Sequence, residues 1–229
     1  MKREPRENKV WYLKSNRLFE DSADDSVRRW EHIFTMREYP KHAAIFAAGD
    51  EPRSVYLVKR GHVRIGRLTA DGKEITVAML GPGDLFGEEA LFGSRERSTV
   101  ATAMDDTLVC VSSADDLFTV LSESPSIALN VAKMLNDRLV DMSAQVEDVA
   151  YAKVADRLVN LFERLVPEHG VDVEDGVKLD VALTHADLAA LIGSTRETVT
   201  TELSALVRAG RIRVEGRTIT LLRAPAGGP

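Results

Sequence analysis

Hydrophobic residues recur at alternating intervals of four and three in the stretch that begins at Ser124. The members of this heptad seam are Val131, Leu135, Leu139, Met142, Val146 and Val149. The pattern predicts a helix that buries one narrow stripe, and Ser124 followed by Pro125 is a favourable helix start. We expect a helix of about 27 residues that pairs with its own copy in a homodimer. An ordinary core helix of a single domain is the alternative.

Before this helix the pattern changes to short β-like runs separated by turns. These runs cover residues 55–58, 63–68, 75–80, 98–104 and 107–112. Asp71 and Gly72 mark a hairpin between the second and third runs. Many short strands with frequent turns predict a β-roll of the jelly-roll kind. Residues 1–40 are polar and weakly periodic, apart from a short helix expected over residues 22–30 with Ser22 as its cap.

The pattern after the long helix differs from both preceding regions. Helical spacing over residues 154–165 predicts an amphipathic helix, which Pro167 and Gly170 are expected to close. Asp175 and Gly176 then mark a hairpin between two short apolar runs.

Two further helices are predicted towards the C-terminus. Thr184 and Asp187 resemble a capping box that opens a short helix, which Gly193 ends. Ser194 and Thr195 are both candidate caps for the helix that follows. Two short helices joined by a glycine-containing turn predict a helix-turn-helix, and the hairpin pattern after them predicts a wing.

These changes of pattern predict an α+β protein of three parts. The parts are a sensor β-roll over residues 1–123, a dimerisation helix over residues 124–152, and a winged helix-turn-helix over residues 153–229. The length of 229 residues is sufficient for two separate cores.

Composition narrows the function classes. Hydrophobic residues make up 44% of the chain and charged residues 29%, and no apolar run approaches the roughly 20 residues that span a bilayer. We therefore expect a cytoplasmic protein that does not insert into membranes. Cys110 is the only cysteine, which excludes an internal disulfide and a cysteine-ligated cluster. The five histidines show no metal-ligand spacing, and no nucleophile–base pattern points to an enzyme.

The net charge is −6, but it is unevenly placed. The segment from Arg196 to Arg223 contains six arginines against three glutamates, so this part of the predicted helix-turn-helix is locally basic. Local charge matters more than the total for contact with nucleic acid.

One segment of the predicted roll combines two glycines, acids, arginines and hydroxyls within fourteen positions, from residue 86 to residue 99. Gly87 allows backbone N–H groups to approach a ligand closely. Arg97 has the fork geometry for phosphate, Ser98 can donate a hydroxyl hydrogen, and Glu88 suits a sugar hydroxyl. A polar loop with solvated ion pairs is the alternative.

This segment resembles the phosphate-binding cassette of cyclic-nucleotide-binding domains. The matching residues are Gly87, Glu88, Glu89, Ala90, Leu91 and Phe92, followed by Arg97, Ser98 and Thr99. The order of roll, long helix and C-terminal reader resembles the cyclic-AMP receptor protein/fumarate–nitrate regulator superfamily, closest to its cyclic-AMP receptor branch. The resemblance implies that Glu88 holds a ribose hydroxyl, and that Arg97 and Ser98 hold a cyclic phosphate.

The same resemblance assigns roles on the long helix. It places Arg138 near the effector pocket and brings Ser143 from the partner subunit to the base. Met142 stands where the cyclic-AMP receptor branch has a threonine that hydrogen-bonds adenine, and methionine offers no such hydroxyl. Cyclic AMP is the implied allosteric effector, with no further cofactor.

The second helix of the predicted pair begins Arg196–Glu197–Thr198–Val199 and resembles the recognition helix of this superfamily. Arginine reads guanine with two hydrogen bonds, and glutamate accepts from cytosine. The expected DNA contacts are Thr184, Thr195, Arg196, Glu197, Thr198 and Thr201, with Arg217 of the wing on a phosphate. Thr201 stands where the cyclic-AMP receptor branch has a second base-reading arginine.

The sequence therefore predicts a homodimeric transcription regulator that is activated by cyclic AMP and binds palindromic double-stranded DNA. RNA polymerase is the expected protein partner. One alternative is a regulator of the same superfamily that acts without an effector. A second alternative is a nucleotide-binding module that regulates a protein partner.

Overall fold

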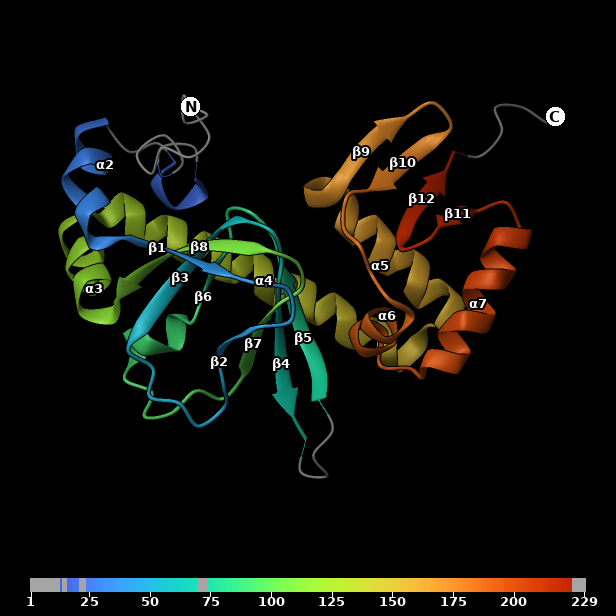
Figure 1. The fold of residues 1–229 in the computed structure, drawn as a ribbon, viewed down its shortest axis with the longest axis horizontal. Helices are drawn as coiled ribbons and strands as arrows, with labels where there is room; N and C mark the ends of the chain where they lie inside the picture. Colours follow the sequence, from blue (N-terminus) through green and yellow to red (C-terminus); the bar gives the residue numbers. More distant parts are fainter. Residues whose placement is uncertain (1–12, 14–15, 21–23, 70–73, 224–229) are drawn as a thin grey trace. The chain divides into compact units, whose positions relative to one another are not determined.

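The long helix predicted from the heptad seam is present as α4, which spans Pro125–Tyr151 (Figure 1). A computed structural model describes Leu13 and residues 16–20, 24–69 and 74–223 of the chain. The chain divides into two units, and the division falls within α4. The first unit comprises residues 1–73 and 77–140, and the second comprises residues 74–76 and 141–229.

The predicted β-roll is confirmed. Its strands are β1 (Thr35–Tyr39), β2 (Ala44–Phe46), β3 (Ser54–Arg60), β4 (Val63–Leu68), β5 (Glu74–Leu80), β6 (Leu85–Phe86), β7 (Val100–Ala103) and β8 (Thr107–Ser113). They form two four-stranded sheets, in the orders β1-β8-β3-β6 and β2-β7-β4-β5. The hairpin expected at Asp71 and Gly72 lies outside the described residues.

Alternation along β3 explains why this strand is buried on both faces. Val55 and Leu57 belong to one hydrophobic core, while Tyr56 and Val58 belong to a second core. Successive side chains of a strand point to opposite faces, so one strand separates the two cores. The second core fills the space between the two sheets. The first core lies between the β1-β8-β3-β6 sheet and the helices outside it.

The N-terminal region contributes more to that outer core than its weak periodicity indicates. It contains η2 (Arg17–Phe19), α2 (Asp24–Trp30) and η3 (Glu31–Ile33). Its buried side chains are Leu13, Leu18, Phe19, Val27, Trp30 and Phe34. The described part of the short helix expected over residues 22–30 is α2, and Ser22 lies outside the described residues.

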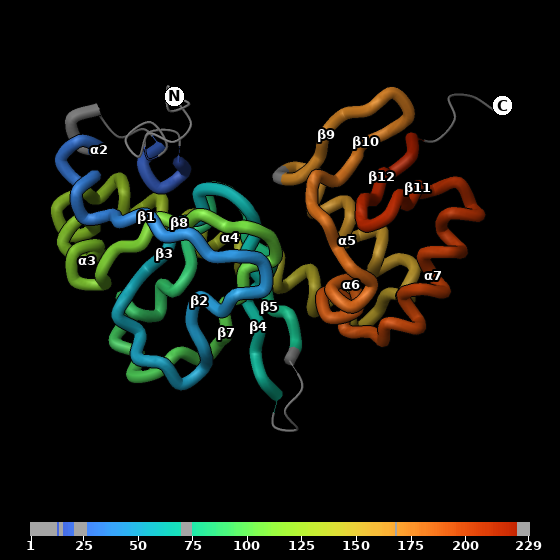
Figure 2. Tube along the Cα trace, in the orientation of Figure 1, coloured from blue at the N-terminus to red at the C-terminus, as the bar shows by residue number. Residues whose placement is uncertain are grey.

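A polar side chain of α4 fixes this N-terminal region. The buried Asn130 side-chain amide donates to the Leu18 carbonyl at 3.3 Å and to the Glu20 carbonyl at 2.9 Å. About two turns further along α4, Asp137 forms an ion pair with Arg17. The start of the described chain therefore packs against α4, as the blue trace beside α3 and α4 shows (Figure 2).

The heptad seam of α4 divides into a buried and an exposed part. Val131 is buried, and it packs with Ile127 and Met134 in the outer core of its own chain. Leu139 is 63% exposed and Val146 is 70% exposed. Only the C-terminal part of the seam therefore remains uncovered in the single chain.

Helix α3 (Ala114–Glu123) precedes α4, and the Ser113 side chain caps its first turn by accepting from the Asp116 N–H. After α4, helix α5 extends over Val154–His169. The expectation that Pro167 closes this helix is wrong, because the helix continues through it. Pro167 lacks the N–H that would bond the carbonyl four residues earlier, and the helix ends two residues after it. The helix ends at Gly170, whose N–H bonds the Val166 carbonyl.

The second unit has the predicted helix-turn-helix and a single sheet. Helices α6 (His185–Ile192) and α7 (Arg196–Arg208) form the pair, and Gly193 ends α6 in the left-handed conformation at φ 63°. The strands are β9 (Gly170–Val173), β10 (Gly176–Leu179), β11 (Ile212–Glu215) and β12 (Thr218–Leu222). The two predicted hairpins join through β10 and β12, giving the order β11-β12-β10-β9. Gly176 permits this pairing, because a Cβ there would overlap the Leu221 carbonyl.

Candidate functional site

The segment with the phosphate-binding pattern forms a short 3-10 helix, η4 (Glu88–Phe92), directly after β6. Gly87 enters it with φ 75°, a left-handed conformation that favours glycine. A Cβ at Gly87 would lie 2.9 Å from the Arg97 Nη1 and 3.1 Å from the Ser54 carbonyl oxygen. Both the turn and the close approach of Arg97 therefore require glycine at this position.

Arg97 is buried in the first unit, and its side chain is only 2% exposed. Its Nη1 donates to the Gly87 carbonyl at 2.9 Å, and its Nη2 donates to the Ser54 carbonyl. Its backbone is fixed as well, because the Arg97 N–H donates to the Asp50 carbonyl and its own carbonyl accepts from Gly49. The guanidinium thus connects β3 with the start of η4, and the Arg97 backbone connects to the loop before β3.

Aromatic rings cover the face of this guanidinium. The Arg97 Cζ lies 4.3 Å from the ring centroid of Phe46 and 5.9 Å from that of Tyr56. Such cation–π contacts stabilise a desolvated charge. Burial raises the pKa of the Tyr56 phenol, and the Arg97 charge opposes that rise. No pattern in the sequence connects Phe46 or Tyr56 with this site.

The hydrogen-bonding capacity around Arg97 is incompletely used. Glu89 Oε1 lies 3.3 Å from Arg97 Nη1, which is within ion-pair range. The two atoms do not form a hydrogen bond, and Glu89 Oε1 is buried without a hydrogen-bond partner among the described residues. Arg97 Nε is also buried, and it has no hydrogen-bond partner among the described residues. Buried polar atoms are normally paired in folded proteins. A donor and an acceptor therefore remain available next to η4.

Arg138 of α4 lies against the same short helix. Its Nη1 is 3.1 Å from the Glu88 Oε1, and its Nη2 donates to the Leu85 carbonyl at 2.6 Å. Both side chains are about one-fifth exposed, so the pair is screened less than a surface pair. The long helix is thereby connected directly to the segment that carries the phosphate-binding pattern.

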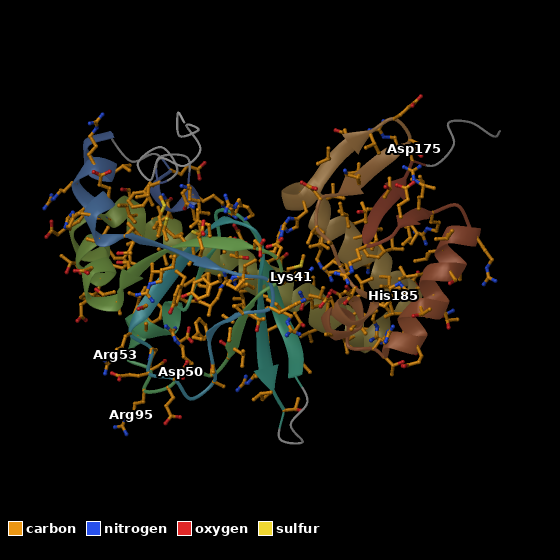
Figure 3. All side chains as sticks on the ribbon, in the orientation of Figure 1. Lys41, Asp50, Arg53, Arg95, Asp175 and His185 are labelled. Atoms are coloured by element: carbon orange, nitrogen blue, oxygen red, sulfur yellow. The ribbon has the colours of Figure 1, made fainter. Side chains whose placement is uncertain are left out.

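The remaining sensor residues named from the sequence have different positions. Ala90 lies within η4, and its N–H donates to the Gly87 carbonyl at 3.2 Å. Ser98 is exposed next to the buried Arg97. Met142 and Ser143 are exposed residues of α4 that belong to the second unit. In the same loop as Arg97, Arg95 points outward from the roll (Figure 3).

The helix-turn-helix has the caps that the sequence predicts. Thr184 forms the capping box with Asp187 at the start of α6. Of the two candidate caps for α7, Thr195 is the one used, since its side chain accepts from the Thr198 N–H at 3.2 Å. These caps fix where both helices begin, and so which residues α7 presents at its N-terminus.

The N-terminus of α7 presents a polar, exposed surface. Arg196, Glu197 and Thr201 are all exposed, and Thr201 Oγ1 donates to the Glu197 carbonyl at 3.1 Å. Arg217 is exposed in the turn between β11 and β12. Arg196 and Arg217 both line a hollow of about 430 Å³, together with Leu183, Thr184, His185, Ala186 and Gly216. Two positive charges therefore lie beside one concave surface.

Comparison with known proteins agrees with both units. A family model described as "Cyclic nucleotide-binding domain" matches residues 36–124. A second model, "Crp-like helix-turn-helix domain", matches residues 152–226. The chain is 32% identical to the cyclic AMP receptor protein of Thermus thermophilus over 212 residues, which covers 93% of this chain and 95% of that protein. The chain belongs to the CRP/FNR family of transcription regulators.

Two further similarities agree with this assignment, one in sequence and one in fold. The chain is 31% identical to the global nitrogen regulator of a Synechocystis species over 188 residues, covering 81% of this chain and 84% of that protein. The solved structure of the c-di-GMP responsive global regulator CLP of Xanthomonas campestris superimposes with a TM-score of 0.76 at 24% identity. It covers 88% of this chain and 100% of that chain, and it supports the fold.

Family membership answers several expectations from the sequence. The protein is a DNA-binding transcription regulator and not an enzyme, and its family forms dimers. The cyclic-nucleotide-binding domain indicates a small-molecule effector.

Among the described residues there is no cluster of potential metal ligands. No helix within the described ranges is both long and apolar enough to cross a membrane.

The burial of Arg97 predicts that this residue stabilises the sensor. Arg97→Ala should lower the free energy of unfolding of the first unit by about 2–3 kcal/mol, because the Gly87 and Ser54 carbonyls lose a charged donor. Chemical denaturation followed by tryptophan fluorescence measures this, because Trp30 is buried in the outer core of the first unit. Exposed Arg95→Ala is the matched control and should have little effect. Equal stability of both variants would contradict the structural role of Arg97.

Proposed function

We propose that this regulator is a homodimer that senses cyclic AMP through the segment around η4. The observation that carries the proposal is the arrangement of Arg97 and Glu88. The buried guanidinium with an available Nε lies at the start of η4, and the Glu88 carboxylate lies on η4 itself. A phosphate needs donors and a ribose hydroxyl needs an acceptor, so this pair suits a cyclic nucleotide.

The similarity to a protein named as a cyclic AMP receptor supports cyclic AMP as the nucleotide. In our proposal Arg97 and Ser98 bind the cyclic phosphate, while Gly87, Glu89 and Ala90 shape the turn that receives it. The Glu88 carboxylate binds the ribose hydroxyl and also pairs with Arg138. Met142 and the partner subunit's Ser143 approach the base.

The proposed mechanism is a population shift. Ligand contacts at η4 and on α4 favour one arrangement of the paired α4 helices, which sets the two recognition helices about one DNA turn apart. We also propose the division into a sensor over residues 1–123, a dimerisation helix over residues 124–152 and a DNA-binding domain over residues 153–229. The protein acts in the cytoplasm, on a palindromic site and together with RNA polymerase.

The first prediction concerns the ribose contact. Glu88→Gln should weaken cyclic AMP binding about tenfold or more, because a charged acceptor is replaced by a neutral one. Calorimetric titration with cyclic AMP and with its 2′-deoxy analogue measures the loss for each ligand. If Glu88 binds the 2′-hydroxyl, the mutation and the deoxy change should not be additive.

Three further results, with cyclic GMP added as a third ligand, distinguish the alternatives. Ser98→Ala should also weaken cyclic AMP, without the loss of stability expected for Arg97→Ala, since Ser98 is exposed. Fully additive losses would show that Glu88 does not contact the 2′-hydroxyl. A wild-type protein that binds DNA but neither cyclic AMP nor cyclic GMP would favour the effector-independent alternative.

The second prediction concerns the dimer. The exposed apolar residues of the C-terminal part of α4 are Leu139, Val140, Met142, Val146, Val149 and Tyr151. An exposed apolar stripe of this length is suited to pack against the same helix of a second copy. Leu139→Asp should therefore give monomers at micromolar concentration in sedimentation, because an unpaired charge would be buried. Asn136→Asp adds the same charge at an exposed position off the seam and should leave the dimer intact. Dimers of Leu139→Asp would contradict the proposal.

The third prediction separates base reading from backbone contact. We propose that Arg196 contacts a guanine edge, with Thr184, Thr195, Glu197, Thr198 and Thr201 as further DNA contacts and Arg217 on a phosphate. Arg196→Ala should cost about 1–3 kcal/mol per half-site and relax the preference at one base pair. Arg217→Ala should weaken all sequences alike and reduce the salt slope by about 0.9 per contact. Binding-site selection followed by salt titration measures both effects.

The same selection tests the register of α7. Thr201→Arg should add a guanine preference at a second base pair and leave the position read by Arg196 unchanged. The proposal fails if Arg196→Ala and Arg217→Ala alter the selected motif in the same way. An unaltered motif for Thr201→Arg would mean that Thr201 does not face the groove.

A further inference from the structure

A histidine at the helix-turn-helix is absent from the DNA contacts expected from the sequence. His185 is the first residue of α6, and it lies beside α7 (Figure 3). Its ring Nδ1 is 2.8 Å from the Thr200 Oγ1. The Thr200 hydroxyl donates its single hydrogen to the Arg196 carbonyl at 2.9 Å. It therefore accepts from His185, which assigns the ring hydrogen to Nδ1.

This hydrogen bond leaves Nε2 as the ring atom that gains or loses a proton. In the neutral ring Nε2 is a bare acceptor, whereas in the imidazolium it is a charged donor. The bond from Nδ1 to Thr200 is the same in both states. Histidine is the side chain that ordinarily changes its charge between about pH 5 and pH 8.

The surroundings of His185 make that charge relevant to DNA. The ring belongs to the lining of the hollow that Arg196 and Arg217 also line. The charged groups in the first turns of α6 and α7 and in the wing turn are Asp187, Arg196, Glu197 and Arg217. The Asp187 carboxylate is occupied by the Thr184 cap, which it accepts from at 2.6 Å and 2.9 Å.

A DNA phosphate at this hollow would discriminate between the two states of the ring. A bare Nε2 offers a phosphate oxygen no hydrogen and repels it, whereas an imidazolium forms a charge-assisted hydrogen bond. Thr200 holds the ring so that this choice is made at Nε2 alone. Binding of the phosphate therefore favours the protonated ring, and protonation of the ring favours binding by the same factor.

We propose that His185 contacts the DNA backbone as the imidazolium, so that DNA binding takes up about one proton in each subunit. His185 is thus a direct DNA-contacting residue, and it makes the regulator bind its site more tightly as the pH falls. The proposal rests on DNA binding by the family and is independent of which effector the sensor recognises.

The test measures DNA affinity against pH and salt. A labelled duplex of about 30 base pairs, carrying the motif recovered by selection, is titrated with the full chain at pH 8 and pH 6. The comparison uses whichever state, with or without cyclic AMP, binds more tightly. Wild-type affinity should rise about tenfold or more from pH 8 to pH 6. The salt slope should steepen by about 0.9 per subunit over the same change, since one phosphate contact is gained.

Substitutions identify the group responsible. His185→Gln should remove most of both changes, and His185→Arg should bind tightly at both pH values. Thr200→Val removes the hydroxyl that bonds Nδ1 and should reduce the pH effect. Thr200→Ser keeps that hydroxyl and should show the wild-type effect. His32→Gln removes an exposed histidine of the sensor and should behave as the wild type.

Two results would overturn the proposal. One is a wild-type affinity for the selected duplex that is the same at pH 8 and pH 6. The other is a pH effect of wild-type size in His185→Gln or His185→Arg. His185→Gln leaves a neutral side chain and His185→Arg leaves a permanently charged one. If one of the variants fails to fold, the other still tests the proposal.

Discussion

The sensor depends on one buried positive charge. The Arg97 guanidinium donates to carbonyls of β3 and of the residue before η4, and it lies over the rings of Phe46 and Tyr56. A charge removed from water is costly unless hydrogen bonds and nearby π-electrons compensate for it. These contacts compensate incompletely, since Nε lacks a partner among the described residues. An anionic ligand at this place would complete them, so the proposed effector and the fold depend on the same side chain.

Arg138 connects this site with the helix proposed to form the dimer. It pairs with Glu88 of η4 and lies one residue before Leu139, the first strongly exposed member of the heptad seam. Towards its N-terminus, α4 is buried in the core of its own chain and holds the N-terminal region through Asn130. The two halves of the helix therefore have different surroundings. A ligand that competes for Glu88 would alter α4 at the boundary between them.

Local pattern determined much of this protein. The strand runs, the long helix, the capping box of Thr184 and the glycine stop at Gly193 all follow from residues within a few positions of one another, and the structure confirms them. The same is true of family membership, because the cassette from Gly87 to Ser98 and the start of α7 are continuous in sequence. Local rules failed at Pro167, where the helix continues to His169 despite a residue that usually ends one.

Contacts between distant residues were decided only by the tertiary structure. The sequence did not indicate that Leu13, Phe19 and Trp30 complete a core, because burial there depends on sheet and helix residues far along the chain. It gave Arg97 as a ligand for phosphate but not as a buried support for the fold, since the Gly87 and Ser54 carbonyls meet only after folding. The pairing of β10 with β12 and the bond from His185 to Thr200 belong to the same class. A pattern of residue types specifies which groups are present, whereas long-range packing specifies which of them meet.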